Sequence, residues 1–298
     1  MLDRLRSDKA VGFLFSGGSA RSVFQVGVVE TLTELGVVPV ACLGVSAGVW
    51  SAAAVSAGSA ASLRQYWRFF CRMPYVDLTN LAREHSPFIW PRLHDRAFRR
   101  YIGVEKIRTG LPLYAALTRL RDRTQVIMDV REAADPFEVL LASNYLPPFY
   151  THARVMAGER YGDGGLTDNV PYEALFERGC DLVVMIVAKG ESEGGLHRNF
   201  ADCDHVIPEQ YRDRVILIQP RHRLPIGFVE RRWERLAPIA EMGRLRAREV
   251  LLGERHPETD VAAKGRAPTA YVSWMFAAMR RRSEVSARRR IAEERDRG

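Results

Sequence analysis

The first 58 residues alternate short apolar runs with stretches of helical spacing, and this alternation limits the folds open to the chain. Residues 11–15 and 37–43 are apolar runs that predict strands, whereas residues 21–35 place Val and Leu on one helical face. A glycine turn follows the first run, and an Ala-rich helical stretch ends near residue 58. The order strand, helix, strand, helix predicts a βαβ unit in a parallel sheet that helices cover on both faces.

The rest of the chain continues this pattern less regularly. We expect further strands at residues 125–130, 182–188 and 215–218, and helices near residues 61–71, 111–121, 136–142, 170–178, 229–252 and 271–293. Residues 74–110 hold three prolines among aromatic and arginine residues and predict an irregular excursion, either a flap over a site or a surface loop. Residues 190–210 predict an exposed polar loop.

The positive charge of the chain is concentrated in its last quarter. The formal net charge is +8, and residues 221–298 supply it with 19 Lys and Arg against 11 Asp and Glu, whereas residues 1–220 are balanced. We therefore expect a main domain over residues 1–220 and a basic helical extension over residues 221–298. The arginine-rich end of that extension suits peripheral contact with an anionic membrane, or a solvated terminal helix. We do not expect a nucleic-acid partner.

Composition and cysteine spacing exclude several classes of protein. Apolar residues make up 47% and charged residues 27% of the chain, which is typical of a globular protein. The cysteines have no CxxC spacing and no histidines at zinc spacing, so we expect reduced thiols and no metal site: Cys42, Cys71, Cys180 and Cys203. The N-terminus lacks the apolar core of a signal peptide, and no apolar stretch is long enough to span a bilayer. We expect a cytoplasmic protein, soluble or peripherally bound to a membrane.

The sharpest local feature is the pentapeptide GVSAG at residues 44–48, between a predicted strand and a predicted helix. A strand that turns abruptly into a helix exposes the side chain at the turn, and its neighbours must be small because the backbones crowd there. Gly44 and Gly48 meet that need. Ser46 is then a candidate nucleophile near the positive end of the following helix, which stabilises developing negative charge.

Residues 17–21, GGSAR, form another glycine turn between a strand and a helix. Such a turn aims successive backbone N–H groups into a cleft and suits either a phosphate or a tetrahedral oxyanion. The loop has neither the GxGxxG spacing of dinucleotide-binding proteins nor the Gly-Lys-Ser/Thr of a P-loop. We therefore interpret Gly17, Gly18 and Ser19 as an oxyanion hole, with a purely steric turn as the alternative.

A serine nucleophile needs a base, and the sequence offers more than one. Asp163 is followed by two glycines in a turn-forming segment, where a carboxylate within reach accepts the serine proton. Asp168 is the rival carboxylate, unless it is a turn or cap residue. A Ser-His-Asp triad is the other arrangement, for which His205 and His222 lie late enough in the chain.

Three segments in order, SGGSARSVFQVGVVETL, GVSAG and DGGLTDNVP, resemble the patatin-like phospholipase family over about residues 11–188. The stretch ASNYLPPF at residues 142–149 resembles the family's sequence ahead of its Asp-Gly-Gly. The resemblance implies a three-layer α/β/α fold with a mainly parallel sheet, and a Ser–Asp dyad in place of a triad. It makes Ser46 the nucleophile and Asp163 the base, with Gly17, Gly18 and Ser19 as the oxyanion hole. The supporting residues are then Arg21, Gly44, Gly48, Gly164 and Gly165.

The glycine loop departs from the family pattern at two positions. The third glycine of the family is Ser19 here, and the glycine after the basic residue is Ser22. A side chain at Ser19 is tolerated on the condition that its φ is negative, and it would narrow the oxyanion hole.

Together these features predict a serine esterase of the phospholipase A type. It would cleave acyl esters of phospholipids or lysophospholipids through an acyl-enzyme, without a metal or organic cofactor. One alternative is an acyltransferase that uses the same dyad with an alcohol as acceptor. Another is a non-catalytic protein that binds membrane or nucleic acid through its arginine-rich C-terminus.

Overall fold

The computed structural model describes residues 1–84, 86–147, 149–150, 152–193, 196, 198 and 205–260. The predicted helix at residues 271–293 lies outside the described residues, as do Cys203 and much of the predicted loop at residues 190–210.

The described residues contain one mixed sheet of eight strands in the order β5-β6-β3-β2-β1-β7-β8, with β4 also paired to β3. Five of the strands, β8, β7, β1, β2 and β3, lie parallel, whereas β4, β5 and β6 join by antiparallel pairing. The strands are β1 Val11–Phe15, β2 Ala41–Val45, β3 Leu113–Arg119, β4 Gln125–Asp129, β5 Arg154–Met156, β6 Glu159–Asp163, β7 Leu182–Ile186 and β8 Val215–Ile218.

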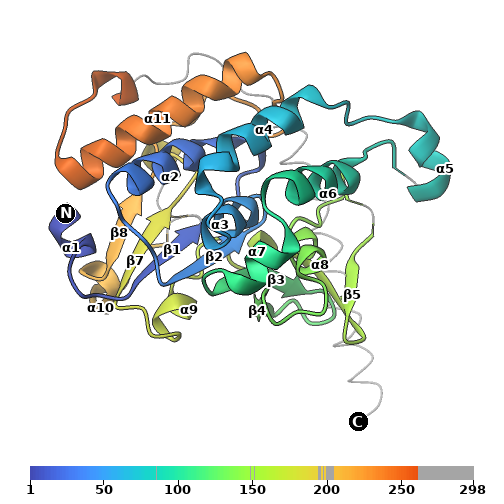
Figure 1. The fold of residues 1–298 in the computed structure, drawn as a ribbon, viewed down its shortest axis with the longest axis horizontal. Coiled ribbons are helices and arrows are strands. Elements are labelled where there is room, and N and C mark those ends of the chain that lie inside the picture. Colours follow the sequence, from blue (N-terminus) through green and yellow to red (C-terminus); the bar gives the residue numbers. More distant parts are fainter. Residues whose placement is uncertain are drawn as a thin grey trace, which may run out of the picture.

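Helices pack on both faces of this sheet (Figure 1). On one face, α2, α3 and α11 share a cluster of apolar side chains with Phe13 and Phe15 of β1. On the opposite face, α9 and α10 contribute side chains to a second apolar cluster, which contains Leu14 of β1. This three-layer arrangement confirms the expected fold. The helices are α1 Leu2–Leu5, α2 Phe24–Glu34, α3 Gly48–Ser56, α4 Leu63–Arg72, α5 Leu81–Glu84, α6 Trp90–Tyr101, α7 Val104–Thr109, α8 Pro136–Ala142, α9 Glu173–Phe176, α10 Glu209–Arg212 and α11 Trp233–Leu252.

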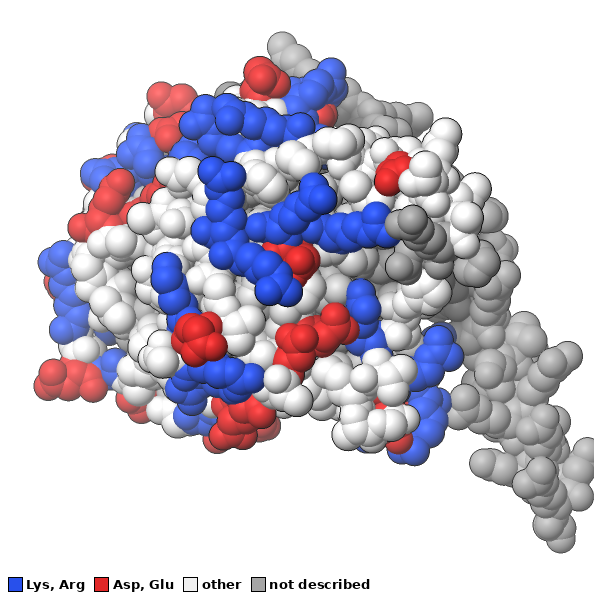
Figure 2. All heavy atoms as spheres, turned by 45° about the vertical axis from the view of Figure 1, so that its right-hand side comes forward, with Lys and Arg blue, Asp and Glu red and all other residues white. Residues whose placement is uncertain are grey.

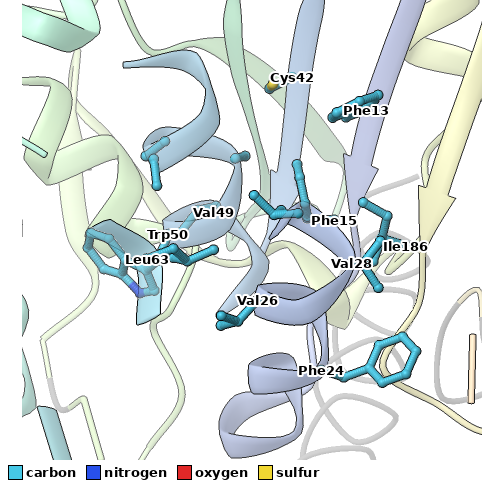
Figure 3. Close-up of a cluster of buried hydrophobic side chains, with 14 of the residues drawn as sticks. Phe13, Phe15, Phe24, Val26, Val28, Cys42, Val49, Trp50, Leu63 and Ile186 are labelled. Atoms are coloured by element: carbon cyan, nitrogen blue, oxygen red, sulfur yellow. The ribbon is translucent and has the colours of Figure 1, made fainter. Parts of the chain in front are cut away.

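The larger core cluster joins the sheet to α2 and α3 (Figure 3). Phe13 and Phe15 lie two residues apart on β1 and therefore share one face of the sheet. Val26 of α2 and Val49 of α3 belong to the same cluster, and all four side chains are almost fully buried. This packing fixes α2 and α3, and each of these helices follows one of the two glycine turns.

Helix α11 packs along α2 at two glycines (Figure 1). A Cβ atom on Gly27 of α2 would overlap the Ala240 carbonyl of α11, and one on Gly243 would overlap the Phe24 carbonyl. Leu236 of α11 belongs to the same core cluster as the sheet. The described part of the basic extension is therefore packed on the body of the protein.

Two predictions between α3 and β4 are wrong. Residues 111–121 contain the central strand β3 and not a helix. A strand covered on both faces is apolar throughout, so it lacks the alternation that separates strand from helix. Residues 74–110 are not irregular throughout, because their second half contains α6 and α7; α6 begins at Trp90 with Pro91 in its first turn, where proline is tolerated.

Strand boundaries also differ from the predicted ones. The second strand is Ala41–Val45, later than the predicted residues 37–43, and the hairpin of β5 and β6 had no predicted counterpart.

None of the helices among the described residues combines the length and apolarity that crossing a bilayer requires.

The glycine contact between α2 and α11 leads to a stability prediction. We expect Gly27→Ala to lower the free energy of unfolding by about 3 kcal/mol, because the added methyl group overlaps backbone that cannot move freely. Urea denaturation measures the loss. The control is Gly227→Ala, where an added Cβ meets nothing within 4 Å; an equal loss in both variants would contradict the close packing.

Candidate active site

Ser46 lies at the turn where β2 passes into α3. Its φ is +51°, a left-handed conformation that is rare for a residue with a side chain. A Cβ atom on Gly44 would overlap the Val49 main chain, and one on Gly48 would overlap the Phe15 carbonyl. The chain turns this sharply because both flanking positions lack side chains, and the turn holds the Ser46 hydroxyl at the carboxyl end of the sheet.

Asp163 is hydrogen-bonded directly to Ser46. The Ser46 Oγ atom donates to Asp163 Oδ2 over 2.7 Å. Asp163 is the last residue of β6, and the antiparallel pairing of β6 with β3 brings it beside the end of β2. A Cβ atom on Gly164 would overlap the Ala116 carbonyl of β3, so the glycine allows this close approach.

The Asp163 carboxylate is held by bonds from its own turn. Its Oδ1 atom accepts a hydrogen bond of 2.8 Å from the Gly165 amide, and its carbonyl accepts one of 2.7 Å from Thr118 Oγ1. Burial raises the pKa of Asp163 to about 7, although the hydrogen bonds from Ser46 and Gly165 act to lower it. A carboxyl with a pKa near neutrality is able to accept a proton and later return it.

The glycine loop packs against the serine. A Cβ atom on Gly17 would lie 2.8 Å from Ser46 Cβ, so only glycine fits there. The Gly17 amide, expected in the oxyanion hole, donates over 2.7 Å to Asn169 Oδ1. The amides of Gly18 and Ser19 have no acceptor among the described residues. These two N–H groups are therefore the candidates within this loop for binding an anion.

The condition of a negative φ at Ser19 is not met. Ser19 has a φ of +51°, the region that a glycine adopts without strain. A serine held in this region bears a conformational strain of about 1–2 kcal/mol. Ser19 lines the pocket that also contains Ser46 and Asp163.

Arg21 lies apart from this pocket. Its guanidinium is close to Glu193 and Arg223, and burial lowers its pKa. Arg21 is absent from the residues that line the pocket around Ser46.

An aromatic pocket opens beside Ser46, and sequence reasoning missed it. It is lined by residues of α3, α4, α6 and two loops, among them Trp50, Trp67, Phe70, Trp90, His94, Phe149, Tyr150 and Phe228. His94 stacks on Trp50 with 4.4 Å between ring centroids, and its Nδ1 atom is hydrogen-bonded to the Tyr66 hydroxyl at 2.6 Å. Burial lowers the pKa of His94 to about 3, so its ring is neutral and the pocket carries no charge from it.

Two polar residues outside the predicted set support the site. The Ser143 Oγ atom accepts a hydrogen bond from the Ser46 amide and donates one to the Ala116 carbonyl, over 2.9 and 2.8 Å. Asn169 joins the glycine loop to the segment that carries Asp163. Both residues lie in segments singled out by the family resemblance, which was the available signal, but no spacing rule assigned their roles.

The rival residues have other partners. Asp168 is paired with Arg198 at 2.7 Å and accepts the Val170 amide at 2.9 Å, as a turn residue does. The His205 ring is hydrogen-bonded to the Tyr172 hydroxyl, and the main chain of His222 lies against Gly190. In the described part of the chain, no histidine is hydrogen-bonded to Ser46.

The fold is that of an α/β protein in which Ser46 lies at a strand-to-helix turn. This serine is hydrogen-bonded to the buried Asp163 carboxylate and lies beside an apolar pocket. The family model described as patatin-like phospholipase matches residues 13–176, more than half of the chain. The chain therefore belongs to the patatin-like phospholipase family.

Individual relatives are distant. Lysophospholipase NTE1 of Kluyveromyces lactis is 24% identical over 206 residues, which are 62% of this chain but only 13% of that protein. The structure of VipD from Legionella pneumophila has a TM-score of 0.51 at 13% identity, covering 86% of this chain and 72% of that one. ExoU of Pseudomonas aeruginosa, in complex with SpcU, has a TM-score of 0.38 at 14% identity, covering 83% and 54%. The VipD structure shares its fold with this chain.

The raised pKa of Asp163 predicts a pH dependence. We expect the rate at which a fluorophosphonate labels Ser46 to rise with pH and to be half-maximal near pH 7, because only the carboxylate accepts the serine proton. A flat rate across neutral pH would contradict this role.

Stability should change with pH in the opposite sense. Because folding raises this pKa, the protonated carboxyl favours the folded state, a contribution that is complete below pH 3.8 and is lost as the pH rises through about 7. Urea denaturation at a series of pH values measures the free energy of unfolding. Asp163→Asn has no carboxyl to ionise at this position, so it should not show this decrease in stability and serves as the control.

Ser19 offers a test of the loop conformation. We expect Ser19→Gly to label within about twofold of wild type, because the backbone already follows a glycine path. Ser19→Val should label at least about tenfold more slowly, because a β-branched residue resists a positive φ. Labelling rates at saturating probe provide the measurement, and equal rates for the two variants would contradict the left-handed loop.

Proposed function

We propose that this protein is a serine lipid acyl hydrolase that cleaves carboxylic esters through a dyad of Ser46 and Asp163. The observation that carries the proposal is the 2.7 Å hydrogen bond from Ser46 Oγ to Asp163 Oδ2, next to an aromatic pocket. Family membership supports the lipid class of substrate. The dyad and the phospholipase A type of cleavage rest on the site itself.

In the first half of the reaction, Asp163 takes the Ser46 proton as Oγ attacks the ester carbonyl carbon. The carbonyl oxygen becomes an oxyanion, and the amides of Gly18 and Ser19 donate hydrogen bonds to it. Gly17 shapes the loop, because its own amide is bonded to Asn169. Asp163 then returns the proton to the leaving alcohol oxygen, and the acyl group stays on Ser46.

In the second half, water replaces the alcohol. Asp163 takes a proton from that water, the hydroxyl attacks the acyl-Ser46 carbonyl, and the same amides hold the second oxyanion. The ester bond to Ser46 Oγ breaks, Oγ regains a proton from Asp163, and the fatty acid leaves. One carboxyl therefore moves every proton, which matches a pKa of about 7.

The pocket supports an acyl chain as the group bound beside Ser46. Trp50, Phe70, Trp90 and Phe149 contribute apolar ring surface to its wall, and His94 is neutral. An acyl chain gains about 0.8 kcal/mol for each methylene that it buries against such a wall. We propose phospholipids or lysophospholipids as substrates, in keeping with the similarity to lysophospholipase NTE1.

Three variants test the dyad. We expect Ser46→Ala and Asp163→Asn each to lower ester hydrolysis by about 10³-fold or more, since each removes a group that acts in the transition state. Asp168→Asn is the matched control, because that carboxylate is bonded to Arg198 and should leave hydrolysis within about threefold. The measurement is the release of fatty acid from lysophosphatidylcholine; hydrolysis that survives in Ser46→Ala would contradict the proposal.

A further inference from the structure

A projecting arm joins α4 to α6 (Figure 1). We define the arm as the described residues within 73–89, which include α5. Apolar side chains on it face solvent: Val76 is 43% exposed, Leu78 74% and Leu81 52%. Single exposed leucines are ordinary on protein surfaces, but three large apolar side chains within six residues of one projection form a local apolar tip.

The arm has a defined conformation. Val76 pairs with Phe88 in an antiparallel bridge, and the Ile89 amide donates to the Tyr75 carbonyl over 2.9 Å. Asn80 is buried and donates its side-chain amide to the carbonyls of Ser86 and Phe88. The exposed leucines are therefore held outward by a hydrogen-bonded frame.

Basic side chains lie on the two helices that flank the arm. The solvent faces of α4 and α6 carry exposed arginines: Arg68, Arg72, Arg92, Arg96, Arg99 and Arg100. Asp95 is the one acidic residue in these two helices, and it is paired with Arg99 at 2.8 Å. Figure 2 brings this side of the molecule forward and shows basic side chains gathered beside surface that carries little charge. Arg92 also donates to Asn80, which ties this basic face to the arm.

The arm is continuous with the pocket at Ser46. Tyr75 and Phe88 stack at its base, with ring centroids 6.0 Å apart. Phe88 contacts Phe149, and Tyr75 contacts Trp90, at 5.1 and 5.8 Å between centroids. Trp90 and Phe149 line the pocket that contains Ser46. An apolar path therefore runs from the exposed tip, through the aromatic base, to the nucleophile.

We propose that the arm and the arginine faces of α4 and α6 dock this protein on the surface of an anionic lipid bilayer. The apolar tip enters the boundary between head groups and acyl chains, and the arginines lie over anionic head groups. This arrangement presents the pocket to lipid in the bilayer. The use of the surface for catalysis rests on the proposed function, whereas the docking itself does not.

Vesicle binding of the full chain tests the docking surface. Flotation with phosphatidylcholine vesicles, with and without phosphatidylglycerol, is measured in the Ser46→Ala background so that no lipid is consumed. We expect the doubly substituted protein Leu78→Asp and Leu81→Asp to bind about tenfold more weakly or worse, because charge replaces apolar surface at the tip. Arg72→Glu and Arg96→Glu should each weaken binding by at least about fivefold, and only when phosphatidylglycerol is present.

Matched controls place equivalent changes at the opposite end of the sheet. Val38 is 72% exposed and precedes β2, and Arg212 is exposed and precedes β8, so both lie away from the carboxyl ends of the strands. Val38→Asp and Arg212→Glu should bind vesicles as the parent does. Equal binding by the arm variants and the parent would overturn the proposal, and so would equal loss in the arm and control variants.

Two further readouts separate this inference from the catalytic one. In the active protein, the arm variants should cleave a water-soluble short-chain ester at the wild-type rate, within about twofold, while hydrolysis of vesicle lipid falls. If no ester is cleaved but vesicle binding still depends on the arm, the proposed function fails and the docking surface stands. A change in oligomeric state that accounts for the loss of binding, measured by light scattering, would instead assign the arm to protein association and overturn lipid docking.

Discussion

The hydrogen bond from Ser46 to Asp163 depends on the position of the Asp163 carboxyl group. This group lies beside the serine, in a region from which water is largely removed. The strand order meets this requirement. Strand β3 pairs in parallel with β2, which Ser46 directly follows, and antiparallel with β6, whose last residue is Asp163. The two proposed catalytic side chains therefore come from neighbouring positions beside one central strand, and burial of Asp163 there raises its pKa to about 7.

Close backbone contacts are the second requirement of this geometry. Gly44, Gly48 and Gly164 each lie where a Cβ atom would overlap main chain, and Gly17 lies against Ser46 itself. Ser46 and Ser19 both hold positive φ angles, so strain is located in the two loops that would bind the reacting ester. Packing of α2 and α3 against the sheet, together with the bonds of Asn169 and Ser143, offsets that strain.

The sequence predicted the layers of the fold and the family, because the glycine turns at residues 17–18 and 44–48 punctuate an otherwise regular strand and helix pattern. It failed at β3, where burial on both faces removes the alternation that marks a strand. The aromatic pocket was also missed, because Trp50, Phe70, Trp90 and Phe149 come from separate elements and meet only through tertiary packing. The positive φ of Ser19 could not be predicted, because a serine in the left-handed region is stabilised by surroundings that no local pattern reveals.

The central claim is that an acyl group passes through Ser46 with Asp163 as the base. Rapid quenching of the protein with excess lysophosphatidylcholine, followed by peptide mass spectrometry, tests it most directly. The account predicts an acyl adduct on the peptide that contains Ser46 in the wild type, and its absence in Ser46→Ala and Asp163→Asn. Hydrolysis without any adduct on Ser46, or an adduct that forms equally fast in Asp163→Asn, would contradict it.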